Sequence, residues 1–316
     1  MRLLVTGVSG LLGSNLAWLA SEQHAVSGVL RGARASAVPG RTPFQVIESD
    51  LTQPGQAERV IALAQPDVVI HCAALTSVDY CEMHPEEAQT VNVTASGMLA
   101  RAAAAYGARM LYVSTDSVFD GTRGGYSEED APNPVNVYAR TKLEGELAVS
   151  AAQPDALIAR VNFYGWSWEG SRSLAEFFYH HLCAGRPVLG YDDVIFCPLL
   201  VNDMVGILLR MLERNLCGLY HVVSSECQSK YAFARMLANA FGLDDCLIAP
   251  ASYRDGRLAA ARSPLLTLRS NKLASALGED LPGQLASMQR FAQLFASGYP
   301  QTLRSLFVEP DHSLVG

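Results

Sequence analysis

The chain has 316 residues, of which 49% are hydrophobic and 17% are charged, and its formal net charge at pH 7 is −7. The charged fraction lies below the ~25% of an average globular protein, which excludes a disordered polyelectrolyte. No block of Lys or Arg occurs, which excludes the basic stripe that nonspecific nucleic-acid binding needs.

The cellular compartment is predicted from the N-terminus and the cysteines. Residues 3–21 carry no charge, but Gly7, Gly10 and Gly13 interrupt them, whereas the apolar part of a signal peptide is continuous. The seven cysteines are widely spaced and include no Cys-x-x-Cys. This usage favours free thiols over a disulfide framework, and no metal-ligand spacing is found. We therefore expect a soluble, cytoplasmic protein with no membrane partner and no bound metal.

The first 165 residues alternate short apolar runs with longer helical patterns. Parallel strands joined by helical crossovers are expected from this spacing. Near-continuous apolar runs are typical of a parallel sheet that is buried on both faces. We predict an α/β fold with a doubly wound, parallel-sheet Rossmann domain over 1–165. Its strands are expected at 2–6, 24–30, 44–48, 68–72, 110–114 and 157–161, and its helices from residue 11 and at 56–64, 85–106 and 137–150.

The regular alternation of expected strands and helices ends after residue 165, where Pro and Gly separate fewer elements. We predict a smaller, mixed substrate-binding domain over 166–316. The strand expected at 218–224 is a candidate for a return to the main sheet. The helices of this part are expected at 174–184, 202–213, 230–241 and 287–296.

A glycine-rich loop lies between the first expected strand and the first expected helix. Gly7, Gly10 and Gly13 have the spacing in which the first glycine permits a tight turn, the second lets a pyrophosphate approach the backbone, and the third lets the helix pack on the sheet. The anion then lies against free N–H groups at the positive end of the helix. The sequence therefore predicts a dinucleotide site.

The end of the second strand bears on the choice of dinucleotide. An acidic residue there would accept the ribose hydroxyls of NAD, but Arg31 and Arg34 stand in its place. A guanidinium matches the 2′-phosphate of NADP. We prefer NADP (NADPH) as the cofactor, with NAD as the alternative. The alternative interpretation of Arg31 and Arg34 is that they are solvated loop arginines. Asp50 can reach the adenine or form a surface turn.

Tyr138 and Lys142 are four residues apart and share one face of an expected helix. A cation beside the phenol favours the phenolate and would lower the pKa of Tyr138 toward the neutral range. Thr115 ends the fifth strand, at the edge of the sheet where ligands bind in open α/β folds. We predict that Thr115 offers its hydroxyl to a substrate carbonyl beside Tyr138, with a satisfied strand-end Thr as the alternative.

Taken in this order and spacing, the glycine loop, Ser114-Thr115-Asp116 and Tyr138-x-x-x-Lys142 resemble an extended short-chain dehydrogenase/reductase. The dTDP-4-dehydrorhamnose reductase family is similar to this chain at residues 72–79, 86–92, 114–119 and 136–146. In the C-terminal part of the chain, the best match to the family is at 261–264 and 271–273. The family implies NAD(P)H-dependent reduction of a 4-keto-6-deoxy sugar nucleotide. In that scheme Thr115 orients the ketone, Tyr138 protonates the developing alkoxide, and Lys142 holds the nicotinamide ribose.

The resemblance also implies binding residues. The cofactor is expected to contact Gly7, Ser9, Gly10, Leu11, Leu12, Gly13, Arg31, Arg34, Asp50, Leu51, Cys72, Ala73, Ala74, Tyr138 and Lys142. The nucleotide-sugar substrate is expected to contact Thr76, Val78, Asp116, Ser117, Asn162 and Arg262. Asn162 has a structural turn as its alternative role. Whether the chain forms a homodimer is left open.

Two departures from the family pattern keep other functions open. Ser117 replaces the usual aromatic residue, and 160–165 are closer to the epimerase/dehydratase branch. A 4,6-dehydratase would carry Glu at position 117, and a 4-epimerase an acid at the end of the second strand. Sugar-nucleotide epimerase or dehydratase activity is therefore the alternative within the enzymes. A non-catalytic, NADP-binding regulatory subunit is the alternative outside them.

Overall fold

The computed structural model describes residues 1–32, 42–255 and 260–308. Arg34 lies outside these residues. A seven-stranded sheet forms the centre of the molecule, with the order β11-β6-β5-β4-β1-β2-β3, and every adjacent pair in it is parallel. Its strands are β1 (Arg2–Thr6), β2 (Ala25–Leu30), β3 (Gln45–Glu48), β4 (Val68–His71), β5 (Arg109–Thr115), β6 (Leu157–Val161) and β11 (Gly218–Val222).

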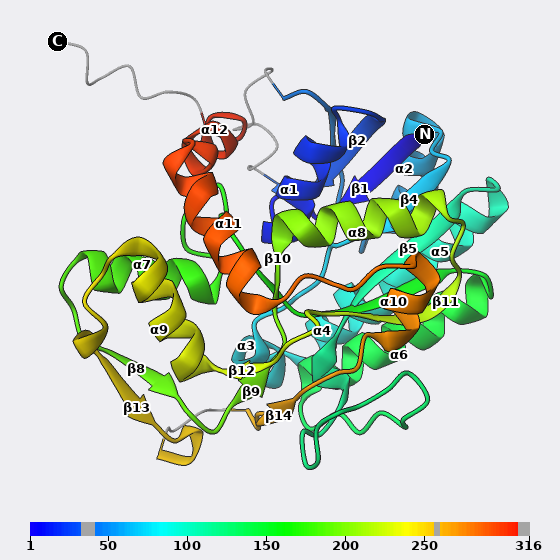
Figure 1. Cartoon of the computed structure of the whole chain (residues 1–316). Coiled ribbons are helices and arrows are strands. Elements are labelled where there is room, and N and C mark those ends of the chain that lie inside the picture. Colours follow the sequence, from blue (N-terminus) through cyan, green and yellow to red (C-terminus); the bar gives the residue numbers. More distant parts are fainter. Residues whose placement is uncertain (33–41, 256–259, 309–316) are drawn as a thin grey trace, which may run out of the picture.

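Both faces of the sheet are covered by helices, which explains the continuous apolar strands. Side chains alternate along a strand, so Leu3 and Val5 of β1 point into one core and Leu4 into the other. The first core is completed by α1 (Leu11–Ala20) and α8 (Val201–Glu213). The second is completed by α2 (Gln56–Ala64), α5 (Ala95–Ala105) and α6 (Val137–Ala152), as Figure 1 shows. The predicted doubly wound α/β fold is confirmed.

The long helix expected at 85–106 is interrupted. It consists of α4 (Pro85–Gln89), a π-helical turn η2 (Thr90–Thr94) and α5, preceded by a short helix α3 (Val78–Met83) that the sequence analysis missed. A π turn frees a carbonyl from the regular helical pattern. The carbonyl of Asn92 accepts hydrogen bonds from Ser96 Oγ at 2.8 Å and from Tyr112 Oη at 3.4 Å.

The second half of the chain contributes a helical layer and three small sheets beside the carboxyl end of the main sheet (Figure 1). Its helices are α7 (Leu174–Cys183), α9 (Lys230–Phe241), α10 (Asn271–Leu277), α11 (Gln284–Ala296) and α12 (Tyr299–Ser305). The short strands pair as β7 (Phe163–Tyr164) with β10 (Leu199–Leu200), β8 (Val188–Tyr191) with β13 (Ile248–Ala251), and β9 (Ile195–Phe196) with both β12 (Gln228–Ser229) and β14 (Leu265–Leu266).

Elements from beyond residue 165 also belong to the main sheet. β11 pairs with β6 along five residues, and α8 packs against α1. The domain boundary expected near 165 stays a prediction, because the second half completes the sheet as well as adding its own layer. Among the described helices, none combines the length and the apolar character that a membrane crossing requires.

Candidate active site

The glycine loop makes a tight turn at the carboxyl end of β1. Gly7 has φ +71°, and a Cβ added there would lie 2.7 Å from the backbone N of Ala73. Gly10 is the N-cap of α1 and has extended backbone, and no side chain caps the helix. The first N–H groups of α1 are therefore available at the positive end of the helix. A side chain at position 7 would collide with the backbone of Ala73, and the free N–H groups of α1 fit the pyrophosphate of a dinucleotide.

A cavity of about 560 Å³ runs from this loop across the carboxyl ends of the strands. It brings together residues that are far apart in the sequence, as expected for a ligand site in an open parallel sheet. Of the predicted cofactor residues it is lined by Gly7, Ser9, Gly10, Leu11, Leu12, Gly13, Arg31, Asp50, Leu51, Cys72, Ala73, Ala74, Tyr138 and Lys142. Of the other predicted residues it is lined by Thr76, Thr115, Asp116, Ser117 and Asn162.

Arg31 and Asp50 lie together at one end of the cavity. Asp50 Oδ1 accepts hydrogen bonds from the N–H of Thr52 at 3.0 Å and from Thr52 Oγ1 at 2.7 Å, so the surface-turn reading of Asp50 holds for this oxygen. Burial raises the pKa of Asp50, but the bonds to Thr52 and the charge of Arg31 outweigh it and leave the pKa lowered. The carboxylate of Asp50 therefore lies near Arg31, and the guanidinium of Arg31 is also accessible to an anion that enters the cavity.

The residues predicted to be catalytic meet where β5 ends. Thr115 is buried and Tyr138 is partly buried, both line the cavity wall, and the Thr115 hydroxyl lies near enough to the Tyr138 phenol to lower its pKa. Thr115 Oγ1 also donates to Asp116 Oδ1 at 3.1 Å and accepts the N–H of Ser117 at 3.2 Å. The Thr115 proton is therefore directed at Asp116 rather than into open space.

Lys142 is buried one helical turn from Tyr138, with its ammonium directed at β5. Nζ donates to Tyr112 Oη and to the carbonyl of Val113, each at 2.8 Å. Burial lowers the pKa of Lys142 to about 7, partly opposed by the carboxylate of Glu146. This lysine can lose its proton in the neutral range, which is unusual for an ammonium.

The expected lowering of the Tyr138 pKa is wrong. Burial raises the pKa of this phenol to about 12, and the hydrogen bond with Thr115 offsets only part of the rise. The physical reason is that the ammonium of Lys142 is hydrogen-bonded to Tyr112 and Val113 instead of to Tyr138. Desolvation therefore has the largest effect on the pKa of Tyr138. Tyr138 consequently keeps its proton at neutral pH.

Asp116 lies at the centre of a group of hydrogen bonds in the cavity wall. Its carboxylate accepts from Asn162 Nδ2 at 2.5 Å and from Ser117 Oγ at 3.2 Å, in addition to Thr115. Burial raises the pKa of Asp116, which these hydrogen bonds and the charge of Lys230 oppose. A sugar hydroxyl that entered here would meet acceptors and donors already aligned.

Two predicted substrate residues, Val78 and Arg262, lie outside the cavity lining. Arg262 Nη2 is paired with Asp79 Oδ2 at 2.9 Å, and Nη1 donates to the carbonyl of Ala260 at 2.9 Å. The contact of this arginine with the α3 region ties residues 260–262 to the first half of the chain. Direct contact of Val78 or Arg262 with substrate stays a prediction.

Several residues that line or support the cavity were missed by the sequence analysis. Tyr112 carries no motif signal, yet it accepts a hydrogen bond from Lys142. His71, in the cavity wall, links Thr6 Oγ1 at 2.7 Å to Ser96 Oγ at 3.0 Å. Arg172 also lines the cavity, from a loop in the second half of the chain. Such contacts form only between elements distant in sequence, so no local spacing indicates them.

Trp166 and Trp168 belong to the packing of the molecule. Trp166 is buried, stacks on Phe291 with ring centroids 4.2 Å apart, and donates from Nε1 to the carbonyl of that residue at 3.1 Å. Trp168 Nε1 donates to the carbonyl of Ser9 at 3.0 Å. This bond fastens the segment after β7 to the glycine loop.

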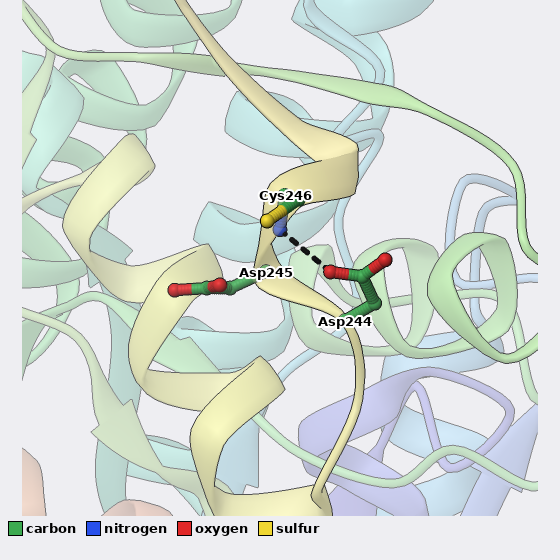
Figure 2. Close-up of side chains that lie close together, drawn as sticks. All are labelled: Asp244, Asp245 and Cys246. Carbon is green, nitrogen blue, oxygen red and sulfur yellow. Dashed lines mark hydrogen bonds between the residues drawn. The ribbon is translucent and has the colours of Figure 1, made fainter.

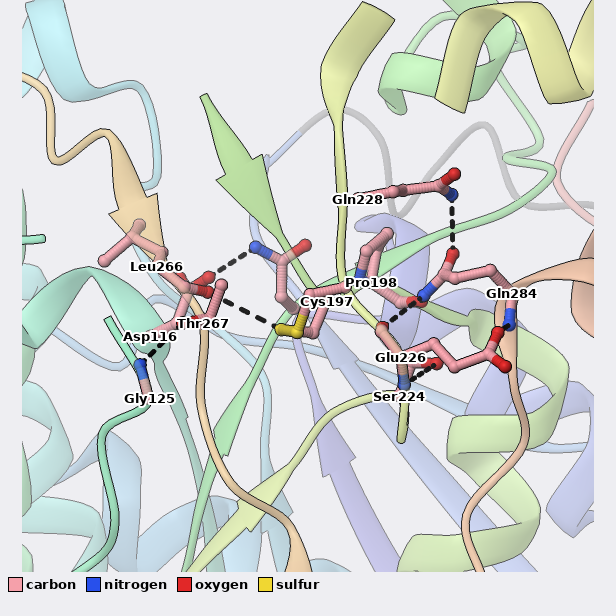
Figure 3. Close-up of a disulfide and its surroundings, with 12 residues drawn as sticks. Asp116, Gly125, Cys197, Pro198, Ser224, Glu226, Gln228, Leu266, Thr267 and Gln284 are labelled. Carbon is pink, nitrogen blue, oxygen red and sulfur yellow. Dashed lines mark hydrogen bonds between the residues drawn. A yellow bond between two sulfur atoms is a disulfide. The ribbon is translucent and has the colours of Figure 1, made fainter. Parts of the chain in front are cut away.

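The expectation that all cysteines are free is wrong for one pair. Cys197 and Cys227 form a disulfide with a Cα–Cα distance of 4.1 Å, and the other five cysteines are free. Two chain segments 30 residues apart are brought together where β9 pairs with β12, a contact that spacing alone does not reveal. Figure 3 shows Asp116 in the surroundings of this disulfide and Gln284 bonded to Pro198 and Glu226 beside it.

One cluster of candidate metal ligands occurs among the described residues, at Asp244, Asp245 and Cys246 (Figure 2). Asp244 Oδ1 accepts the N–H of Cys246 at 2.9 Å and caps the short helix η4 (Asp245–Leu247). Asp245 is paired with Arg235 at 2.7 Å. Capping and ion pairing account for this cluster.

The family comparison covers nearly the whole chain. A family model described as "RmlD substrate binding domain" matches residues 1–296. A dTDP-4-dehydrorhamnose reductase of Mycobacterium tuberculosis is 35% identical over 284 residues, which cover 87% of this chain and 87% of that protein. Methionine adenosyltransferase 2 subunit beta of Bos taurus is 34% identical over 258 residues, which cover 79% of this chain and 75% of that protein.

Solved structures agree with the sequence relatives. The dTDP-4-dehydrorhamnose reductase of Bacillus anthracis in complex with NADP superposes with a TM-score of 0.78 at 25% identity, covering 92% of this chain and 98% of that chain. The orthologue from Clostridium acetobutylicum also has a TM-score of 0.78 at 25% identity, covering 94% and 100%. The chain therefore belongs to the RmlD substrate-binding domain family, within the extended short-chain dehydrogenase/reductase superfamily.

Proposed function

We propose that this protein is an NADPH-dependent reductase of a 4-keto-6-deoxy sugar nucleotide. The observation that carries the proposal is the shared cavity, in which the glycine loop at the N-terminus of α1 and the Thr115–Tyr138–Lys142 group line the same walls. When bound, the reduced nicotinamide supplies a hydride. Relatives named dTDP-4-dehydrorhamnose reductase support this substrate class.

Tyr138 is the proton donor of the reaction. A phenol with a pKa of about 12 is fully protonated at neutral pH, and it gives up this proton only when hydride addition turns a ketone oxygen beside it into a strongly basic alkoxide. Thr115 is the neighbouring hydroxyl that orients the carbonyl. For this the Thr115 proton must turn from Asp116 toward the substrate, which a substrate hydroxyl bonding to Asp116 would favour.

Lys142 binds a ribose hydroxyl of the cofactor. Its side chain is held in place by Tyr112 and Val113, so no rotamer entropy is lost when the ligand binds. Arg31 supports NADPH as the cofactor, because its exposed guanidinium at the end of β2 can pair with a 2′-phosphate.

A screen of NADPH oxidation tests the proposed reaction. Purified protein is mixed with 4-keto-6-deoxy sugars linked to different nucleoside diphosphates, and absorbance at the nicotinamide band is followed, with NADH as the parallel cofactor. Stoichiometric oxidation with at least one substrate, faster with NADPH, is expected. Redox-neutral interconversion of the sugar would instead show an epimerase, and preference for NADH would overturn the cofactor assignment.

A regulatory subunit is the second candidate function. Its support is the 34% identity to methionine adenosyltransferase 2 subunit beta. Under this alternative the cavity binds NADP without turnover, and the chain associates with a methionine adenosyltransferase. Absence of NADPH oxidation across the substrate screen, together with co-elution of the chain with such an enzyme, would favour it over the reductase.

A further inference from the structure

Arg172 lines the same cavity as the glycine loop, although it comes from the loop between β7 and α7. Cavity walls in the described part of the chain carry three other basic side chains: Arg31 at the end of β2, Lys142 beside Tyr138, and His71. Burial lowers the pKa of His71 to about 3, so this imidazole is neutral. The glycine loop itself, residues 7–13, contains neither Lys nor Arg.

The loop that carries Arg172 is held rigidly over the cavity. Glu176 is fully buried, and its carboxylate accepts the N–H groups of Ser167 at 2.6 Å, Arg172 at 2.8 Å and Ser173 at 3.0 Å. Trp168 bonds the carbonyl of Ser9, which fastens this loop to the glycine loop. Arg172 therefore projects from a fixed backbone beside the N-terminus of α1.

The guanidinium of Arg172 is also oriented. Nε and Nη2 form two bonds to the carboxylate of Glu169, at 2.5 and 2.8 Å. This two-point contact fixes the plane of the guanidinium, and 37% of the side chain stays accessible. A planar cation held in this way is suited to a phosphate oxygen that enters from the cavity.

We propose that Arg172 is a binding residue for a diphosphate group in this cavity, with Glu169 as its positioning residue. The inference rests on the proposed function, which supplies two diphosphates: the pyrophosphate of the dinucleotide and the diphosphate of the nucleotide sugar. The N–H groups of α1 hold one side of the diphosphate, and Arg172 supplies guanidinium donors, which the glycine loop lacks.

Binding titrations of the full chain distinguish the two sources. The probes are NADPH, 2′-AMP (which lacks a pyrophosphate) and thymidine diphosphate, measured by calorimetry on the wild type and on Arg172→Met. If Arg172 binds the cofactor pyrophosphate, the variant binds NADPH at least ~10-fold more weakly and 2′-AMP normally. If it binds the sugar-nucleotide diphosphate, thymidine diphosphate is weakened by ~10-fold and NADPH is not.

Controls separate a lost contact from a damaged fold. Arg172→Lys keeps the charge and should recover part of the affinity. Arg235→Met removes another ion-paired arginine, outside the cavity lining, and should change nothing. A change below twofold for both diphosphate ligands, an equal loss for 2′-AMP, or the same loss in Arg235→Met would overturn the inference while leaving the reductase proposal intact. Failure of the wild type to bind NADPH would overturn both.

Discussion

At the scale of single residues, burial rather than sequence spacing decides the protonation of the catalytic pair. Tyr138 and Lys142 are one helical turn apart, which suggested mutual tuning. In the structure, desolvation raises the pKa of Tyr138 and lowers that of Lys142. The two groups are therefore most stable as a neutral phenol and as a lysine close to its titration point.

The first prediction concerns the pH dependence of turnover. Because the pKa of Lys142 is lowered to about 7, its ammonium is lost as the pH rises through the neutral range, whereas Tyr138 keeps its proton. We expect kcat/KM for reduction to fall by about tenfold per pH unit above the Lys142 pKa. Initial rates at low substrate between pH 6 and 9 measure this.

Lys142→Arg is the matched variant, since a guanidinium stays charged throughout this range. Whatever its absolute rate, its profile should lack the alkaline fall. A flat wild-type profile, or the same fall in Lys142→Arg, would contradict the assignment of this pKa to Lys142.

The sequence predicted the members of the site better than their contacts. Gly7, Tyr138 and Lys142 were found because their function depends on local spacing. Tyr112 was missed, since its bond to Lys142 arises from packing of α6 on β5. Gly145 illustrates the same limit: a Cβ there would lie 2.5 Å from the carbonyl of Asn92, a clash that exists only after the elements are packed.

At the scale of elements, strands and helices in the first half were predicted well because each has a strong apolar period. The short strands β7–β10 and β12–β14 were not predicted, since two to four residues carry no usable periodicity. The π turn η2 was missed for a different reason. It interrupts a helix whose apolar pattern continues through it, and its effect is visible only in the hydrogen bonds of the Asn92 carbonyl.

The second prediction concerns the disulfide between β9 and the start of β12. A cross-link that closes a loop of about 30 residues stabilises a fold by roughly 3 kcal/mol. Denaturant unfolding with and without a thiol reductant should differ by about this amount. The Cys197→Ser/Cys227→Ser protein should show the lower stability in both conditions, and Cys183→Ser, at an exposed free cysteine, should match the wild type.

Thiol titration provides the direct check. The denatured, unreduced protein should expose five reactive thiols, against seven after reduction. Seven thiols without reductant would show that Cys197 and Cys227 are not linked, and would restore the original expectation of free cysteines.

At the scale of the whole molecule, buried histidines couple the stability of the sheet to pH. Burial lowers the pKa of His71 on β4 and of His221 on β11 to about 3. Both folded-state pKa values lie below the unfolded value of ~6.5, so the unfolded chain takes up these protons first. Their contribution to stability is complete above pH 6.5 and is lost as the pH falls toward 3.

The third prediction isolates one of these histidines. Asp116, Glu176 and Asp203 have raised pKa values and act in the opposite direction, so the wild type is compared with His221→Phe. Between pH 6.5 and 4.5, the unfolding free energy of the wild type should fall by about 1.4 kcal/mol per pH unit more than that of the variant. Urea unfolding at three pH values measures the difference, and parallel slopes would contradict a neutral, buried His221.

The central claim is that Tyr138 gives a proton to a ketone that receives hydride from bound reduced nicotinamide. The most direct measurement is turnover of an active keto-sugar nucleotide with NADPH that carries deuterium at both C4 positions of the nicotinamide, by the wild type and by Tyr138→Phe. We predict deuterium at the reduced carbon and a loss of at least ~100-fold in kcat for the variant, while NADPH still binds. Turnover by Tyr138→Phe at the wild-type rate, or a reduced sugar without deuterium, would contradict the account.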